Sequence, residues 1–75
     1  MVSYKPLFKL LIDKNMSKAD LRRLANISPN TMTKLSRGEE VSMTVLNKIC
    51  ATLGVSYGDI VEYVPDNNFR KQVEE

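Results

Sequence analysis

Residues 17 to 38 read SKADLRRLANISPNTMTKLSRG, and this stretch predicts two short helices joined by a tight turn. Ser17 is a good N-cap for the first helix, and Asp20, three residues later, completes the pattern of a capping box. Asn26 follows the last apolar residues of this helix, and asparagine tolerates the left-handed backbone that ends helices. The first helix therefore has a defined beginning and a defined end.

The second helix lies between Ser28, its predicted N-cap, and Gly38, which suits a left-handed helix end. Pro29 fits the first helical position, where its missing N–H is not needed. Met32 and Leu35 are the apolar residues of this helix, and a spacing of three places them on one face. The other positions carry polar side chains: Asn30, Thr31, Thr33, Lys34, Ser36 and Arg37. Such a helix is either a solvated surface or a surface that reads another molecule.

The rest of the chain predicts three more short helices. Residues 4 to 15 carry leucines at helical spacing, and residues 42 to 54 run from a serine cap to a glycine. Residues 56 to 64 repeat the capping pattern before a proline. We therefore predict an all-α domain of five short helices over residues 1 to 66. Residues 67 to 75 are then a C-terminal tail, either mobile or part of a dimer contact.

The composition argues against catalysis. The 75-residue chain has no histidine and one cysteine, so it lacks the usual paired nucleophiles and the ligands of a zinc site. Its three glycines do not form a phosphate-binding motif. It also contains neither an apolar run of about 18 residues nor a signal-peptide pattern. We expect a cytoplasmic protein that is not an enzyme and uses no cofactor, metal, membrane or small-molecule substrate.

Charge is distributed unevenly along the chain. Residues 1 to 38 contain eight Lys and Arg against two Asp, whereas residues 39 to 75 contain three basic residues against seven acidic ones. An oriented field of this kind steers a basic face towards phosphates. From charge alone, ordinary solvated helix faces are an equally good interpretation.

The order of capped helix, Asn26, apolar Ile27 and capped polar helix resembles the helix-turn-helix of the Cro and C1 repressor family. Residues 3 to 66 as a whole resemble the small, single-domain members of that family, including the link Leu53-Gly54-Val55-Ser56. The resemblance implies a lambda-repressor-like domain of five helices. Its second and third helices form the helix-turn-helix, and the third enters the major groove of DNA.

The resemblance also implies roles for individual residues. The positions that read bases in the family are occupied by Asn30, Thr31, Thr33 and Lys34, whose side chains can pair with adenine, contact thymine or donate to guanine. Phosphate contacts are implied for Lys18, Ser28, Arg37 and Lys5. Arg22 departs from the family, because many relatives have a small alanine there, and it either contacts phosphate or makes the crossing of the two helices looser. The alternative for each is a solvated helix position. Glu39 and Glu40 depart from the family, because relatives often place basic residues in this loop.

Apolar residues near the C-terminus exceed what so small a core can cover, and they predict a dimer contact: Tyr57, Val61, Tyr63, Val64 and Phe69. We expect a sequence-specific regulator, most simply a repressor, that binds double-stranded DNA as a symmetric homodimer. An antitoxin or adaptor that uses the fold mainly to bind another protein is the alternative. RNA binding is a weaker one, because the predicted reading face has no aromatic residue for stacking.

Overall fold

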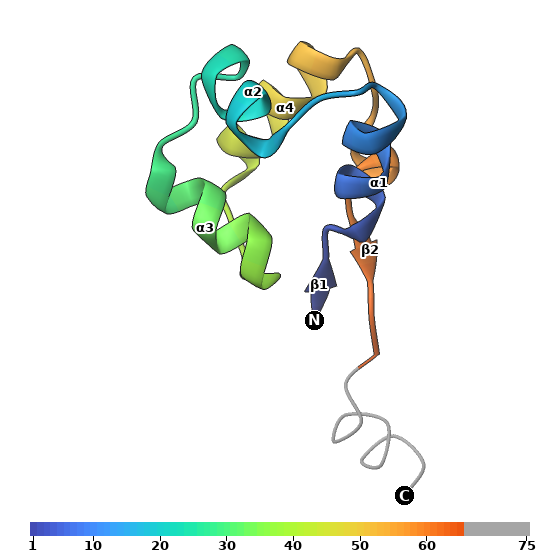
Figure 1. Ribbon diagram of the computed structural model, residues 1–75. Helices are drawn as coiled ribbons and strands as arrows, with labels where there is room; N and C mark the ends of the chain where they lie inside the picture. The colour runs from blue at the N-terminus through green and yellow to red at the C-terminus, as the bar shows by residue number, and fades with distance from the viewer. Residues whose placement is uncertain (66–75) are drawn as a thin grey trace, which may run out of the picture.

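Four α-helices account for most of residues 1–65, the part of the chain that the structure, a computed structural model, describes (Figure 1). They are α1 (Lys5–Asp13), α2 (Lys18–Leu24), α3 (Pro29–Arg37) and α4 (Met43–Leu53). The all-α class predicted from the sequence is confirmed. None of the helices in the described part is long and apolar enough to cross a membrane.

The predicted helix boundaries follow from local signals. Ser17, Ser28 and Ser42 are the N-caps of α2, α3 and α4, and each serine Oγ accepts a hydrogen bond from a backbone N–H three residues later. Gly38, with φ of 74°, ends α3 in the left-handed region that glycine adopts without steric cost. Asn26 has φ of 56° and is also left-handed. The turn between α2 and α3 is therefore the tight one that the sequence predicts.

The prediction of a fifth helix over residues 56 to 64 was wrong. A single 3-10 turn, η1 (Tyr57–Asp59), is followed by the short strand β2 (Glu62–Tyr63). This strand pairs antiparallel with β1 (Val2–Ser3), so that Val2 lies opposite Tyr63 and Ser3 opposite Glu62. The described chain thus has a small sheet where none was predicted.

The residues explain why this helix does not form. Gly58 lies within its first turn, where glycine weakens a helix, and Ile60, Val61 and Val64 are β-branched residues that favour extended structure. The turn closes when the N–H groups of Ile60 and Val61 donate to the carbonyl of Tyr57, and the chain then straightens. Pairing with residues about 60 positions earlier stabilises the strand.

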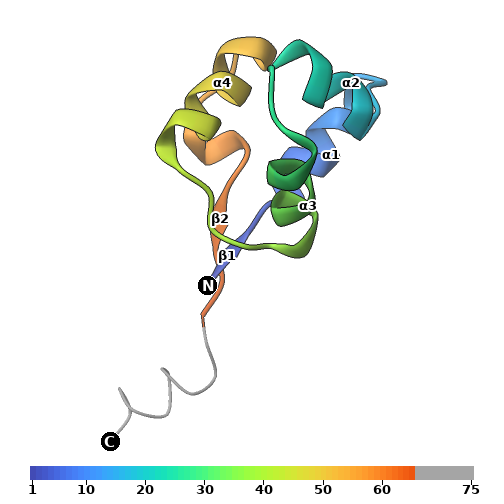
Figure 2. The same ribbon diagram turned by 90° about the vertical axis from the view of Figure 1, so that its left-hand side faces the viewer.

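The core lies where α1, α2, α3 and α4 converge, and all the fully buried large side chains are aliphatic: Leu7, Leu21, Leu35, Ile49 and Ile60. Leu24 follows Leu21 at helical spacing, yet its side chain is 59% exposed. The buried stripe of α2 is narrow, because Leu21 and Ala25, four positions apart, supply it. The two ribbon views agree that the sheet lies close to the C-terminal end of α3 (Figures 1 and 2).

Candidate nucleic-acid interface

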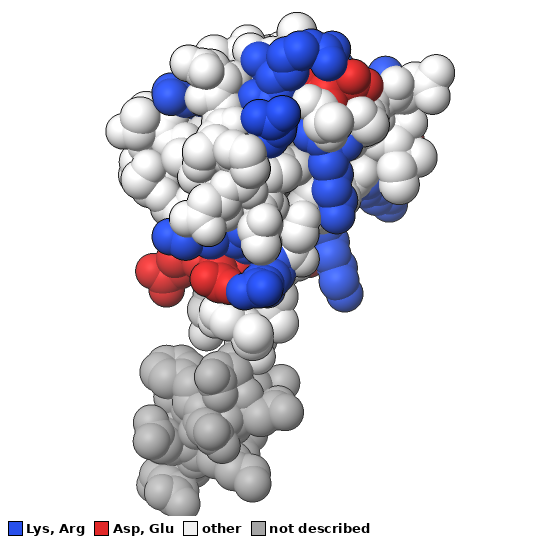
Figure 3. All heavy atoms as spheres, turned by 60° about the vertical axis from the view of Figure 1, so that its left-hand side comes forward, with Lys and Arg blue, Asp and Glu red and all other residues white. Residues whose placement is uncertain are grey.

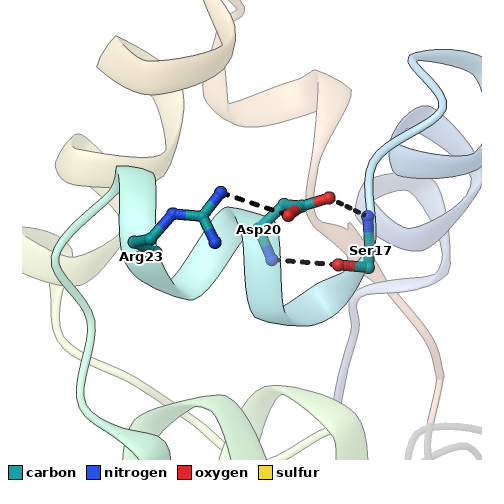
Figure 4. A network of polar contacts seen from close by, with 3 residues as sticks. All are labelled: Ser17, Asp20 and Arg23. Atoms are coloured by element: carbon teal, nitrogen blue, oxygen red, sulfur yellow. Dashed lines mark hydrogen bonds and ion pairs between the residues drawn. The ribbon is translucent and has the colours of Figure 1, made fainter.

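Helix α2 is fixed at its N-terminus by reciprocal hydrogen bonds (Figure 4). The Asp20 N–H donates to Ser17 Oγ at 3.0 Å, and the Ser17 N–H donates to Asp20 Oδ2 at 3.0 Å. Arg23 Nη2 lies 3.3 Å from Asp20 Oδ1. The hydrogen bonds from Ser17 are the main cause of the lowered pKa of Asp20. Its carboxylate therefore stays ionised at neutral pH and keeps the cap in place.

The turn between α2 and α3 is held from two sides. The Ile27 N–H donates to the carbonyl of Arg22 at 3.0 Å, and the Ile27 side chain is buried in the core. From α4, Lys48 Nζ donates to the carbonyl of Asn26 at 3.4 Å. These contacts set the angle between α2 and α3. This angle decides whether α3 can project from the surface.

Helix α3 buries Met32 and Leu35 and leaves its polar residues at the surface. The side chains of Asn30, Thr33 and Lys34 are exposed, whereas Thr31 is half-buried. Within residues 1–65 the side chains of Asn30 and Lys34 make no hydrogen bond. Two of the four predicted base-reading residues therefore present donors and acceptors that are not used within the described chain.

The hydroxyl groups at the start of α3 are engaged within the helix. Ser28 Oγ accepts from the Thr31 N–H at 3.1 Å and donates to the Thr31 hydroxyl at 2.9 Å. The Thr33 hydroxyl donates to the carbonyl of Pro29 at 3.1 Å. These bonds orient the two threonine side chains, so a contact with DNA would use their methyl groups or a shared hydroxyl.

The predicted phosphate-contact residues differ in their surroundings. Lys18, the first residue of α2, reaches across to α3: its Nζ donates to Ser36 Oγ at 3.2 Å and lies 4.7 Å from the centroid of the Phe8 ring. Arg37 Nη1 lies 3.7 Å from Glu39 Oε2 in an exposed ion pair. Lys5 is exposed at the N-terminus of α1 and Arg22 is half-buried on α2.

Basic side chains extend over the face of the molecule that carries α3 (Figure 3). Acidic atoms on this face gather mainly at two places, and basic side chains lie next to both. A duplex carries one negative charge per about 1.7 Å of its axis, so a face of this kind is favourable for DNA.

A family model for the Cro/C1-type HTH DNA-binding domain matches residues 7–66. The chain belongs to this family. The family resemblance predicted from the sequence is confirmed, and the match covers residues 7–66 of the predicted 3 to 66. A Cro/C1-type HTH domain binds double-stranded DNA, which is a polyanion. The polar helix and the basic face are therefore features of a DNA-binding domain.

A solved structure supports the same assignment for this Cro/C1-type chain. The crystal structure of the transcriptional regulator VanUg, Form II, is 48% identical in sequence and superposes with a TM-score of 0.84. The similarity covers 87% of each of the two chains. A comparison with curated protein sequences found no significant match.

Sequence reasoning missed the contacts that join distant parts of this Cro/C1-type domain. Lys18 and Ser36 are 18 residues apart, and the hydroxyl of Tyr4 donates to the carbonyl of Glu39 across 35 residues. No local spacing signals such pairs. The predicted dimer-contact residues Tyr57, Val61, Tyr63 and Val64 lie on η1, on β2 and beside them, and Phe69 lies outside the described residues.

Proposed function

We propose that this protein is a sequence-specific transcriptional regulator that reads the major groove with α3 and acts as a repressor. The observation that carries the proposal is the exposed face of α3, where Asn30 and Lys34 stand one helical turn apart. Both are side chains that form specific contacts with base edges. Repression then follows from occupancy, because a protein bound in a promoter excludes other proteins from the same DNA.

In this proposal Thr31 and Thr33 add contacts beside Asn30 and Lys34, and a second set of residues binds phosphates. That set is Lys18, Ser28, Arg22, Arg37 and Lys5. Support comes from the family match and from the basic face around α3 (Figure 3). Contacts to phosphate fix the register of the protein on the duplex, whereas contacts to base edges carry the sequence information.

Lys34→Ala is expected to weaken binding to the preferred site by about 1 to 3 kcal/mol and to relax the preference at one base position. The reason is that a base-edge contact is local, so its loss affects one base pair. Binding-site selection followed by fluorescence anisotropy on single-base variants measures both effects. Equal loss of affinity on every sequence would make Lys34 a phosphate contact and remove it from the reading set.

We also propose that the protein binds an inverted repeat as a homodimer. One such module buries only about 600 to 1,000 Å² on DNA, whereas two modules on half-sites about 34 Å apart place both reading helices on one side of the duplex. The replacement of the predicted fifth helix by β2 changes the surface available for dimerisation. A strand edge now stands where a helix face was expected.

The register of the sheet supports this dimer. The Val64 N–H donates to the carbonyl of Met1 at 2.9 Å. In an antiparallel pair, successive residues direct their N–H and C=O groups alternately towards the partner strand and away from it. The N–H and C=O of Tyr63 therefore point to the outer edge of β2. The Tyr63 side chain is 67% exposed beside this edge. A second copy related by a two-fold axis could add its own β2 there.

Tyr63→Lys is expected to raise the dimer dissociation constant by at least about tenfold, because a tyrosine at the centre of an interface often contributes 1 kcal/mol or more and is lost from both copies. Thr44→Lys, an equal change of charge at an exposed position on α4, is the control and is expected to dimerise normally. Sedimentation velocity at micromolar concentration measures this. A wild-type protein that is monomeric both free and on its selected DNA would refute the dimer.

A further inference from the structure

Tyr4, the residue before α1, lies in the core and contacts the loop that follows α3. Its side chain is 4% exposed, and its hydroxyl donates to the carbonyl of Glu39 at 2.8 Å. Burial is the main cause of the raised pKa of this hydroxyl, with a smaller opposing effect from a backbone hydrogen bond at Val41. The hydroxyl therefore stays protonated at neutral pH and remains a donor.

The same loop residue is bonded to the reading helix. The Glu39 N–H donates to the carbonyl of Lys34 at 2.9 Å, and the Gly38 N–H donates to the carbonyl of Leu35 at 3.2 Å. Glu39 thus receives one hydrogen bond from Tyr4 and donates another to Lys34. Two consecutive bonds connect the start of α1 to the backbone of a proposed base-reading residue.

Side-chain packing leaves room at this end of α3. A hollow of about 340 Å³ is lined by Val2, Tyr4, Phe8, Leu35 and Gly38, among others. A Cβ on Gly38 would stand 3.6 Å from the carbonyl oxygen of Val2, so the backbones of β1 and of the helix end are close neighbours. The end of α3 therefore borders the sheet and an open hollow rather than a filled core.

Two buried side chains alone do not fix the direction of a helix. Met32 and Leu35 are three positions apart, so α3 could tilt about this short anchored segment. Its N-terminal end is held by the buried Ile27, and at its C-terminal end the Tyr4 hydrogen bond holds the residue that follows Gly38. A tilt at that end would move Lys34 and Arg37 relative to a groove, where misplacement by about 1 Å is costly.

We propose that Tyr4 is a positioning residue for DNA reading: it does not touch DNA, and its hydroxyl sets the orientation of the C-terminal half of α3 through Glu39. This inference rests on the proposed function, because it gives a role to the direction of a reading helix. It adds a residue outside the helix-turn-helix to the determinants of specificity.

Tyr4→Phe tests the proposal, because phenylalanine keeps the buried ring and removes the hydroxyl. Dissociation constants are measured on two duplexes, one with the sequence that the wild type selects from a random pool and one with that sequence scrambled. The ratio of the dissociation constant on the scrambled duplex to that on the selected duplex is expected to fall about fivefold, the equivalent of one lost hydrogen bond. The constant on the scrambled duplex should change less than about twofold, because non-specific binding depends on charge.

Amide hydrogen exchange of the free protein gives a second readout without DNA. Exchange at the Glu39 N–H should become faster in Tyr4→Phe, because the Glu39 backbone loses one of its two hydrogen bonds. Thr52→Val is the matched control: it also removes a hydroxyl that donates to a backbone carbonyl, that of Lys48 at 2.8 Å, within α4. All constants are measured at a temperature at which circular dichroism shows every variant folded.

The outcomes distinguish a failure of the positioning role of Tyr4 from a failure of the proposed DNA reading by α3. A lower ratio for Tyr4→Phe with an unchanged ratio for Thr52→Val supports positioning by Tyr4. An unchanged ratio for Tyr4→Phe overturns it even if the melting temperature falls, and so does an equal loss in Thr52→Val. If the wild type does not distinguish the two duplexes, or if Lys34→Ala leaves its preference intact, the proposed reading by α3 fails first and Tyr4 loses its role with it.

Discussion

Leu35→Ala is expected to lower the free energy of unfolding by about 2 to 5 kcal/mol. Leu35 is 1% exposed and is one of two residues that anchor α3 in the core. A domain of this size rarely has more than about 3 to 5 kcal/mol of stability, so much of the variant should be unfolded at 37 °C. Urea denaturation followed by circular dichroism at 222 nm measures the change.

The matched control is Leu24→Ala, the same chemical change at a leucine of the helix-turn-helix that is 59% exposed. Its cost is expected to lie within about 0.5 kcal/mol, as for ordinary surface substitutions. The two variants lose the same atoms, so any difference between them reports burial. Equal destabilisation of the two variants would contradict the packing described for α3.

The helices were predictable because their signals are local. A serine N-cap, a proline at the first helical position and a glycine or asparagine at the end each act within one turn, and the caps of α2, α3 and α4 are where the sequence places them. Residues 56 to 64 carry the same capping pattern, yet the turn at Tyr57 stops after three residues. The strand that follows depends on Val2 and Ser3, so its formation could not be deduced from a window of nine residues.

The candidate site likewise combines features that local sequence predicts with contacts that it does not predict. The polar face of α3 is predictable from helical spacing, because it requires only that Met32 and Leu35 point inward. The partners of the basic residues are not predictable in this way. Lys18 meets Ser36 and Phe8 only because three helices converge, and the position of Tyr4 beside Glu39 depends on the whole path of the chain.

The second large expected effect is on the salt dependence of DNA binding. Four basic residues per protomer are proposed to contact phosphates: Lys5, Lys18, Arg22 and Arg37. Each neutralised phosphate contributes about −0.9 to the slope of log K against log salt, so a dimer should give about −7. Arg37 is already paired with Glu39, and without it the slope would be about −5. Affinity should therefore fall by about 10³ to 10⁴ between 50 and 200 mM salt.

The slope also distinguishes one bound protomer from two, because a monomer with the same contacts gives about half the value. Lys18→Met keeps an apolar stem over Phe8 and removes the charge, and it should make the slope of a dimer less steep by about 1.8. Lys14→Met removes a charge from the exposed residue that follows α1, which is not among the proposed contacts, and should leave the slope unchanged. Anisotropy titrations at four or more salt concentrations give these slopes. If the slope is the same in Lys18→Met as in the wild type, the Lys18 ammonium serves only to join α2 to Ser36 and Phe8.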